Sequence, residues 1–287
     1  MSTLITGASG FSGLKLSQRI VGKKILLSRN SNFSKNIKQD VQFINCNLND
    51  SNKLDKIIDK YKPKEIFHLA GSFTGDYDID YNTNVNLTRN LLESVKHFSK
   101  DSKVLLIGSA SEYGKIQKNQ CPIDENHPLS AYSTYALTKI YQKSLMDYYV
   151  NTQSLNILMA RTFNLFGKGI SSLLFIGKLY EEIEKVKKGY SDKIKLGNLE
   201  SERDYLSIDD AVGHYTQIMK KGIIGEVYNV GSGFPTKTKD ILKKILKEEK
   251  LDFNIIKSNT RFIQANDSDC IYSNITKLKL LYDEKGF

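Results

Sequence analysis

The chain lacks the features of membrane, secreted and disulfide-stapled proteins. It has no tryptophan, four prolines and three cysteines in 287 residues. No run of about 18 apolar residues occurs, so we expect neither a membrane-spanning helix nor a membrane partner. Met1 to Leu4 lead into an apolar strand without the basic flank of a signal peptide. These absences predict a cytoplasmic protein.

The three cysteines, Cys46, Cys121 and Cys270, are an odd number and lie far apart without CxxC spacing. This pattern argues against a disulfide framework and against a zinc site. We therefore expect reduced thiols and no metal.

The formal net charge is +10. The lysines are spread along amphipathic segments such as Lys237 to Lys250, and are not clustered with aromatic residues as in nucleic-acid-binding surfaces. The charge indicates a solvated surface with some attraction for polyanionic small molecules, and no nucleic acid partner.

The amino terminus contains the most specific local motif. An apolar strand, Ser2 to Thr6, is followed by a glycine-rich loop and by a helix over Leu14 to Val21. Glycines in this setting permit a tight turn and close approach of a pyrophosphate to the helix N-terminus. The spacing is GxxGxxG, and the loop predicts a dinucleotide site formed by Gly7, Ser9, Gly10, Phe11, Ser12 and Gly13.

The end of the second strand, Lys24 to Ser28, is where the adenosine ribose of a dinucleotide is expected. The sequence offers Arg29 there and no acidic side chain. An arginine suits a 2′-phosphate, so we favour NADP(H), with NAD(H) possible. Arg29 as an ordinary surface residue is the alternative.

Strands and helices then alternate along the chain, which predicts an α/β fold: a Rossmann-type, doubly wound parallel sheet with ligands at the carboxyl ends of the strands. The expected strands are 41–46, 65–69, 103–108 and 155–161, and the expected helices are 53–60, 84–97 and 134–150.

Tyr135 and Lys139 stand four residues apart in the last of these helices, so they share one face. A nearby ammonium lowers the pKa of a phenol, which predicts a general acid or base. The spacing alone also arises by chance in a chain rich in tyrosine and lysine.

Nine motifs follow one another along the chain: TGASGFSG from Thr6, NL from Asn47, HLAG from His68, NV from Asn84, GSASEYG from Gly108, YALTK from Tyr135, RTFNLFG from Arg161, GNLESERDY from Gly197 and YNVGSG from Tyr228. Together they resemble the motifs of extended short-chain dehydrogenases/reductases of the nucleotide-sugar-modifying group. The neighbourhoods of Ile170 to Leu174 and Gly197 to Tyr205 look most similar to reductases of GDP-4-keto-6-deoxy-mannose.

The resemblance implies a catalytic set in which Ser109 binds the substrate oxygen, Tyr135 transfers a proton and Lys139 assists Tyr135 and holds the nicotinamide ribose. It implies further cofactor contacts from Asn47, Leu48, Leu69, Ala70 and Gly71, and substrate contacts from Ser111, Glu112, Asn164 and Arg203. It also implies a nucleotide-diphosphate sugar as ligand, a role in polysaccharide biosynthesis and a homodimer formed through the helices at 84–97 and 134–150.

Departures from the family pattern reduce the number of reactions that the chain is expected to catalyse. Dehydratases of the group need a glutamate at the position of Ser111, and alternation in an extended segment predicts that Glu112 faces away from the sugar. Fucose synthases need a cysteine just after the catalytic serine, where this chain has Ala110 and Ser111. NADPH-dependent reduction of a 4-keto nucleotide sugar is the reaction that remains. A 4-epimerase with tightly held NAD and a non-catalytic NADP-binding sensor are the alternatives.

The domains are expected to be interleaved in sequence. Residues 1–164 and 205–232 are predicted to form the nucleotide-binding domain, and 165–204 and 233–287 the substrate domain. In the second half we expect helices over 178–188, 211–221 and 237–249, with Asp209 and Asp210 capping the middle one.

Overall fold

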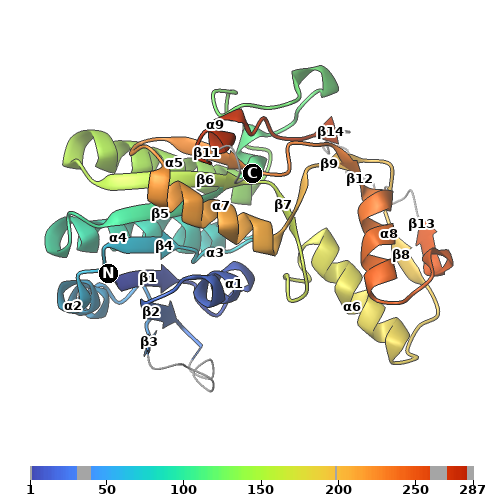
Figure 1. Ribbon diagram of the computed structural model, residues 1–287, viewed down its shortest axis with the longest axis horizontal. Coiled ribbons are helices and arrows are strands. Elements are labelled where there is room, and N and C mark those ends of the chain that lie inside the picture. The colour runs from blue at the N-terminus through green and yellow to red at the C-terminus, as the bar shows by residue number, and fades with distance from the viewer. Residues whose placement is uncertain (1, 31–39, 198, 259–269, 283–287) are drawn as a thin grey trace.

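A computed structural model describes residues 2–30, 40–197, 199–258 and 270–282. Its centre is a seven-stranded sheet in the order β11-β6-β5-β4-β1-β2-β3, in which every neighbouring pair is parallel (Figure 1). The strands are β1 (Ser2–Thr6), β2 (Lys23–Ser28), β3 (Val41–Asn45), β4 (Glu65–His68), β5 (Lys103–Ser109), β6 (Asn156–Thr162) and β11 (Val227–Val230). The predicted Rossmann-type sheet is confirmed.

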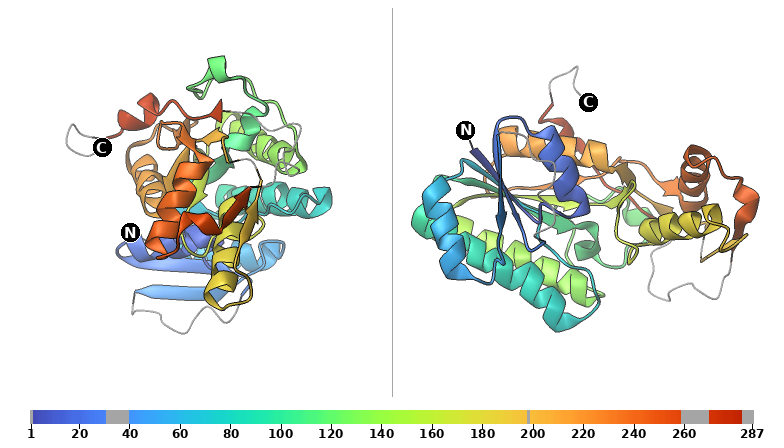
Figure 2. Two further views of the ribbon diagram at one scale, coloured as in Figure 1. Left: turned by 90° about the vertical axis from the view of Figure 1, so that its right-hand side faces the viewer. Right: turned by 90° about the horizontal axis from the view of Figure 1, so that it is seen from below.

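Helices cover both faces of the sheet, as the view from below shows (Figure 2). One face is covered by α2 (Ser51–Tyr61), α4 (Leu87–Phe98) and α5 (Thr134–Gln153), and the other by α1 (Phe11–Arg19), α7 (Ile208–Lys221) and α9 (Thr276–Lys279). Each layer of helices packs against the sheet in its own apolar core. The strands contribute to both cores, since strands of a parallel sheet that are buried on both faces are apolar almost throughout. The strands of the sheet begin and end within about two residues of the predicted limits.

The helix expected over 84–97 has a more complex start. A short helix, α3 (Tyr77–Tyr81), runs into a π-helical turn, η2 (Asn82–Asn86), before α4 begins at Leu87. Single π-turns inside helices are rare and occur mostly at functional sites. This one places Asn84, which is fully buried, against α5.

A smaller lobe lies beyond the carboxyl end of the sheet, on the right of Figure 1. Its apolar core lies between α6 (Phe175–Lys187) and α8 (Thr238–Glu248). Short strands complete it: β7 (Asn164–Phe166) pairs with β10 (Tyr205–Ser207), β8 (Ile194–Leu196) with β13 (Ile256–Ser258), and β9 (Glu202–Arg203) with both β12 (Thr236–Lys237) and β14 (Cys270–Ile271). Three single-turn 3-10 helices, η3 (Ala110–Tyr113), η4 (Lys118–Gln120) and η5 (Phe253–Ile255), lie in connecting segments.

The predicted cap of the helix over 211–221 needs a correction. That helix, α7, begins at Ile208, and Ser207 caps it by accepting a hydrogen bond from the Asp210 N–H at 3.1 Å. Asp209 and Asp210 stand in the first turn, where negative charge suits the helix dipole.

The last described segment belongs with the sheet as well as with the smaller lobe. Ile275, Leu278 and Leu281 pack in the same core as α1 and α7. The domain boundaries stay a prediction, and residue 198 of the GNLESERDY motif and residues 259–269 and 283–287 lie outside the described part of the chain. Within that part, no helix is both long and apolar enough to span a membrane.

Asp204 ties three separate segments together where the two lobes meet. It is 0% exposed, and its carboxylate accepts hydrogen bonds from the backbone N–H groups of Ser232, Gly233 and Ser273 and from both serine hydroxyls. A buried carboxylate is stable only when such donors replace water.

We predict that Asp204→Asn lowers the free energy of unfolding by roughly 2–4 kcal/mol, because an amide NH₂ would face backbone donors and leave them unpaired. Urea denaturation measures the loss. Asp209→Asn is the matched control: Asp209 is exposed and pairs with Lys15 at the surface, so its change should stay within about 1 kcal/mol. Equal effects of the two substitutions would contradict the role of Asp204.

Candidate active site

The glycine-rich loop joins β1 to α1, and two of its glycines are needed for close packing. Gly7 has φ of +64°, and a Cβ there would lie 2.7 Å from the backbone of Leu69 and Ala70. A Cβ on Gly13 would lie 2.3 Å from the Gly7 carbonyl oxygen. Gly10, the N-cap of α1, caps the helix with no side-chain hydrogen bond. The loop therefore leaves backbone and a helix N-terminus facing the carboxyl edge of the sheet, which suits a pyrophosphate.

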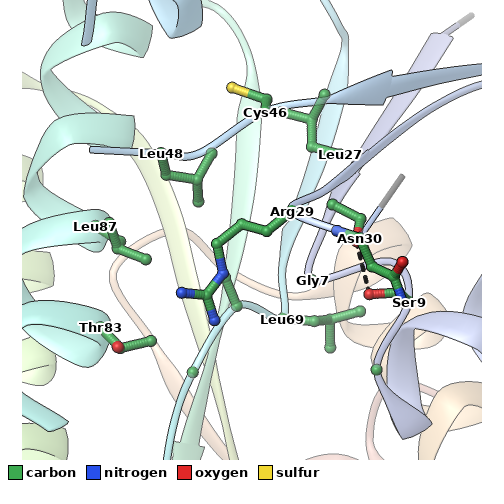
Figure 3. Close-up of a pocket in the computed structure, with 14 residues that line it drawn as sticks. Gly7, Ser9, Leu27, Arg29, Asn30, Cys46, Leu48, Leu69, Thr83 and Leu87 are labelled. Carbon is green, nitrogen blue, oxygen red and sulfur yellow. Dashed lines mark hydrogen bonds between the residues drawn. The ribbon is translucent and has the colours of Figure 1, made fainter. Parts of the chain in front are cut away.

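A cavity of about 280 Å³ opens beside this loop (Figure 3). Arg29 reaches across it from the end of β2, with Asn30 and Ser9 on one side, and Ser28 also lines the cavity. Ser28 links the other two, because its hydroxyl bonds the Ser9 hydroxyl at 2.7 Å and accepts the Asn30 N–H at 3.0 Å. The lining residues are Gly7, Ser9, Gly10, Leu27, Ser28, Arg29, Asn30, Cys46, Leu48, Leu69, Ala70, Gly71, Thr83 and Leu87.

Seven of the predicted cofactor residues outside the catalytic set thus meet at the loops after β1, β2 and β4, and Leu48 joins them from the loop after β3. Asn47 does not line this cavity: it is exposed, and its side-chain oxygen accepts the Asn49 N–H in the turn before α2. The preceding residue, Cys46, which directly follows β3, lines the cavity instead. Phe11, Ser12 and Gly13 form the start of α1 beside the cavity and stay predicted contacts.

Three of the six cavity residues that sequence reasoning missed stand at strand ends. Leu27, Ser28 and Cys46 stand at the carboxyl ends of β2 and β3, a position that the parallel sheet itself could have indicated. Thr83 enters from the π-helical turn, for which the sequence gives no comparable signal.

Ser109, Tyr135 and Lys139 meet at the end of β5. Ser109 is the last residue of the strand, and Ser133 caps α5 so that Tyr135 stands in its first turn and Lys139 one turn later. The Ser109 and Tyr135 hydroxyls share a hydrogen bond. The Lys139 ammonium lies 5.8 Å from the centre of the Tyr135 ring.

The loop after β4 is fixed against this set from the other side. Asp80 is fully buried and accepts hydrogen bonds from Ser72, Thr74 and Gly75. Asn84 from the π-helical turn accepts the Ser72 N–H at 3.0 Å and donates to the Thr138 hydroxyl at 2.9 Å. These buried polar contacts therefore hold the loop after β4 and the first turns of α5 together.

The electrostatics of Tyr135 differ from the prediction. Burial raises the pKa of Tyr135 to about 12, opposed by the hydrogen bond from Ser109. Lys139 is not among the groups that shift this pKa, contrary to the prediction. Its ammonium donates to the Ile107 carbonyl at 2.8 Å and to the Gln142 side-chain oxygen at 3.1 Å. Tyr135 is thus a protonated phenol at neutral pH, which can act as a proton donor.

Ser111 determines the role of the Ser109 hydroxyl by donating two hydrogen bonds to its oxygen. The Ser109 oxygen accepts the Ser111 N–H at 3.2 Å and the Ser111 hydroxyl at 2.9 Å, which fills both lone pairs. The single hydrogen of Ser109 is left for the Tyr135 oxygen or for a ligand oxygen in its place. Ser111 therefore contacts Ser109 directly and makes it a donor, and its contact with a substrate stays a prediction.

Glu112 is not available to a substrate, and its predicted substrate contact is wrong. The side chain is 0% exposed, and its two oxygens accept the Ser109 N–H at 2.7 Å and the Arg161 Nε–H at 2.8 Å. Burial raises the pKa of Glu112, while Arg161 and the Ser109 N–H oppose this shift. The alternation argument, which turned Glu112 away from the sugar, agrees with this geometry.

The remaining predicted substrate residues meet at one corner of the smaller lobe. Asn164 is exposed at the start of β7 and contacts the Asp204 carbonyl through its side-chain amide at 3.3 Å. Arg203, the neighbour of Asp204, is half-buried and donates to the Glu202 carbonyl at 2.9 Å. Both contacts with a substrate stay predictions. Among the described residues no group of three His, Cys, Asp or Glu side chains could hold a metal ion.

A parallel Rossmann sheet with serine, tyrosine and lysine at its carboxyl edge defines a short-chain dehydrogenase/reductase. Comparison with known proteins specifies the group. The family model described as GDP-mannose 4,6 dehydratase matches residues 4–282, and the chain belongs to this family of nucleotide-sugar-modifying enzymes.

Two curated relatives show the range of activities among similar proteins. The chain is 27% identical over 209 residues to GDP-6-deoxy-D-mannose reductase of Pseudomonas aeruginosa, which covers 71% of this chain and 69% of that protein. It is 28% identical over 255 residues to UDP-glucose 4-epimerase of Mycolicibacterium smegmatis, covering 84% of this chain and 80% of that protein.

Solved structures share the fold across the whole chain. One is RMD from Pseudomonas aeruginosa complexed with NADPH, with a TM-score of 0.82 and 22% identity, covering 100% of this chain and 94% of that one. At this identity the likeness shows the fold.

Lys139 gives a test that needs no substrate. It is 5% exposed, and burial lowers its pKa from 10.5 to about 8. Below about pH 8 the ammonium is charged in both the folded and unfolded states, so the full cost of burying it is present. Between pH 8 and 10.5 the folded state loses the proton first, the unfolded state binds more protons, and stability rises with pH.

We predict that the free energy of unfolding of the wild type, minus that of Lys139→Met, rises by roughly 2–3 kcal/mol across this window. Urea denaturation at a series of pH values measures both proteins, and other titrating groups cancel in the difference. A difference that stays flat with pH would show that Lys139 is not a buried ammonium.

Proposed function

We propose that the protein reduces the 4-keto group of a nucleotide-activated, GDP-linked deoxy sugar with NADPH. The observation that supports this most directly is the meeting of Ser109, Tyr135 and Lys139 beside the cavity, with Ser111 where a dehydratase needs glutamate. The resemblance to GDP-6-deoxy-D-mannose reductase supports the GDP-linked sugar.

The residues around the cavity fit a dinucleotide. Gly7 and Gly13 have no room for a Cβ, and the N-terminus of α1 faces the loop that would carry a pyrophosphate. NADPH, when bound, supplies the hydride for the carbonyl carbon. Lys139 would bind the ribose next to the nicotinamide, because its ammonium lies 3.6 Å from the place of a Cβ on the cavity residue Gly71.

The chain's own groups then handle the oxygen of the sugar. Ser109, which Ser111 keeps as a donor, would hydrogen-bond the carbonyl oxygen. Tyr135 would give that oxygen its phenolic proton as the negative charge develops, and the product is a secondary alcohol. Lys139 would contribute by binding the ribose and not by lowering the pKa of Tyr135.

Asn164 and Arg203 are our candidates for contacts with the nucleotide diphosphate. Arg203 offers a fork of donors that suits phosphate oxygens, and Asn164 is exposed on the neighbouring strand pair. Both lie around the Asp204 corner, which would hold them in place.

A nucleotide-sugar 4-epimerase is the second candidate, because the similarity to UDP-glucose 4-epimerase is of the same order as that to the reductase. An epimerase uses the same serine, tyrosine and lysine but retains NAD and recycles its hydride. A sensor that only binds NADP has no need for the three catalytic groups together, so we place it last.

We further propose a homodimer formed through α4 and α5, and action in the cytoplasm in polysaccharide biosynthesis. Support for the dimer comes from exposed aromatic residues on one side of α5, Tyr141 and Tyr148. Sedimentation that finds only monomer at micromolar concentration would rule the dimer out.

Purified protein incubated with NADPH and GDP-4-keto-6-deoxy-mannose should oxidise NADPH, followed by loss of the absorbance of its reduced nicotinamide. Protein that carries bound NAD⁺ through purification and consumes no NADPH would instead favour the epimerase. In this assay Tyr135→Phe should cut turnover at least about 10²-fold while NADPH affinity changes by less than about 1 kcal/mol. Near-normal turnover of the variant would refute the role of Tyr135.

Arg29 should decide between the two nicotinamide cofactors. We predict that Arg29→Ala weakens binding of NADPH about 10-fold or more and changes binding of NADH less than about 2-fold, because only NADPH has a 2′-phosphate for the guanidinium. Fluorescence titration of the reduced cofactors measures both. Lys60→Ala, which removes an exposed cation on α2, is the control for net charge and should leave both affinities unchanged.

A further inference from the structure

A row of buried polar side chains lies behind Lys139, away from the cavity. It runs from Gln142 on α5 through Thr88 on α4 to His68 at the end of β4. Gln142 and Thr88 are 0% exposed and His68 is 1% exposed. Polar groups cost free energy when buried unless they are hydrogen-bonded, so this row requires a physical explanation.

Lys139 determines which groups donate and which accept along the row, because an ammonium can only donate hydrogen bonds. Its nitrogen donates to the Ile107 carbonyl at 2.8 Å and to the Gln142 side chain at 3.1 Å. Gln142 must therefore present its amide oxygen to Lys139. Its amide nitrogen then points the other way and donates to the Thr88 hydroxyl at 2.8 Å.

The Thr88 hydroxyl determines which ring nitrogen of His68 carries a hydrogen. Its one hydrogen is donated to the Asn84 carbonyl at 2.7 Å, so its oxygen can only accept from its other neighbours. His68 Nε2 lies 3.0 Å from that oxygen and must carry a hydrogen. His68 is thus the Nε2–H tautomer, and Nδ1 is an acceptor.

The row ends in the sheet. The Thr6 hydroxyl donates to His68 Nδ1 at 2.8 Å and accepts the Ala70 N–H at 3.3 Å. Burial, with a smaller contribution from the Lys139 charge, lowers the pKa of His68 to about 3. His68 therefore stays neutral, and protonation does not reverse the direction of the row at ordinary pH.

The titratable groups that face Lys139 from other elements are Glu112, Asp80 and His68. Glu112 on η3 and Asp80 on α3 raise its pKa, against the larger effect of burial, and His68 on β4 is neutral. Tyr135, on the same helix, is a protonated phenol. Among the described residues, the groups that contact the ammonium directly are both uncharged oxygens, of Ile107 and of Gln142.

We propose that Gln142 is a positioning residue of the active site: its amide oxygen, oriented by Thr88 and His68, holds the Lys139 ammonium and leaves the third N–H for the cavity side. Gln142 touches no predicted ligand and acts through Lys139. The inference rests on the proposed function only for its effect on turnover, since the state of Lys139 can be measured without a substrate.

The test titrates Lys139 by NMR in protein labelled with ¹³C at the lysine ε-carbon, and Lys139→Arg identifies the signal by its loss. The wild-type pKa should lie near 8. Gln142→Leu removes an acceptor and should lower it by about one unit or more, whereas Gln142→Glu places a carboxylate at the same distance and should raise it by a similar amount. Thermal unfolding of each variant checks that it is folded.

A second pair of variants tests the orientation of the amide. Thr88→Ser keeps the hydroxyl and should leave the pKa of Lys139 within about 0.3 units of the wild type. Thr88→Val removes the acceptor that holds the Gln142 amide and should lower the pKa of Lys139 in the same direction as Gln142→Leu. Loss of stability in both Thr88 variants without a difference in this pKa would indicate packing alone.

Opposite shifts in Gln142→Leu and Gln142→Glu support the positioning role, because a residue that only fills space would not move the pKa in two directions. Identical Lys139 titrations in the wild type and both Gln142 variants would overturn it. Where the reductase assay gives turnover, Gln142→Leu should lower kcat about 10-fold or more with a smaller change in KM for the sugar. Absence of turnover in the wild type would count against the proposed function and leave the NMR result standing.

Discussion

The buried ion pair of Arg161 and Glu112 joins the parts of the structure on which the active site depends. Arg161 is 1% exposed on β6, and Glu112 follows strand β5, which ends at Ser109. Glu112 holds the backbone of Ser109, while Arg161 also donates to the Tyr113 hydroxyl at 3.0 Å. Tyr113 in turn donates to Asn229 on β11. One pair of charges thus fixes the carboxyl ends of three neighbouring strands.

Such a pair is retained at a cost, because removing two charges from water is expensive and an apolar replacement is often at least as stable. What the pair supplies here is position. An apolar residue at 112 could not accept the Ser109 N–H at the carboxyl end of β5. The constraint also explains why Glu112 is unavailable to a substrate even though it is only three residues from Ser109.

The sheet was predictable because its signals are local. Apolar strands such as Lys103–Ser109 alternate with amphipathic helices, and the glycine spacing at Gly7 admits few other structures. The side-chain contacts were less accessible. Burial sets the raised pKa of Tyr135, and the sequence around Tyr135 does not reveal it. Ile107 and Gln142 accept the hydrogen bonds of Lys139 without belonging to any recognisable motif. The position of Asn47 shows the same limit, since a one-residue offset decides that Cys46 lines the cavity and Asn47 does not.

Two cations, Lys139 and Arg161, explain why the hydrogen bonds of the site have a fixed direction. Neither can accept a hydrogen bond, so each forces its neighbours to present oxygen. Gln142 accepts from Lys139 and Glu112 accepts from Arg161, and these roles then determine whether their other partners donate or accept. Ser109 is likewise held as a donor by Ser111, and Tyr135 is kept protonated by burial. A site arranged in this way presents hydrogen, not lone pairs, to the oxygen of a ligand, which is what a carbonyl oxygen gaining negative charge requires.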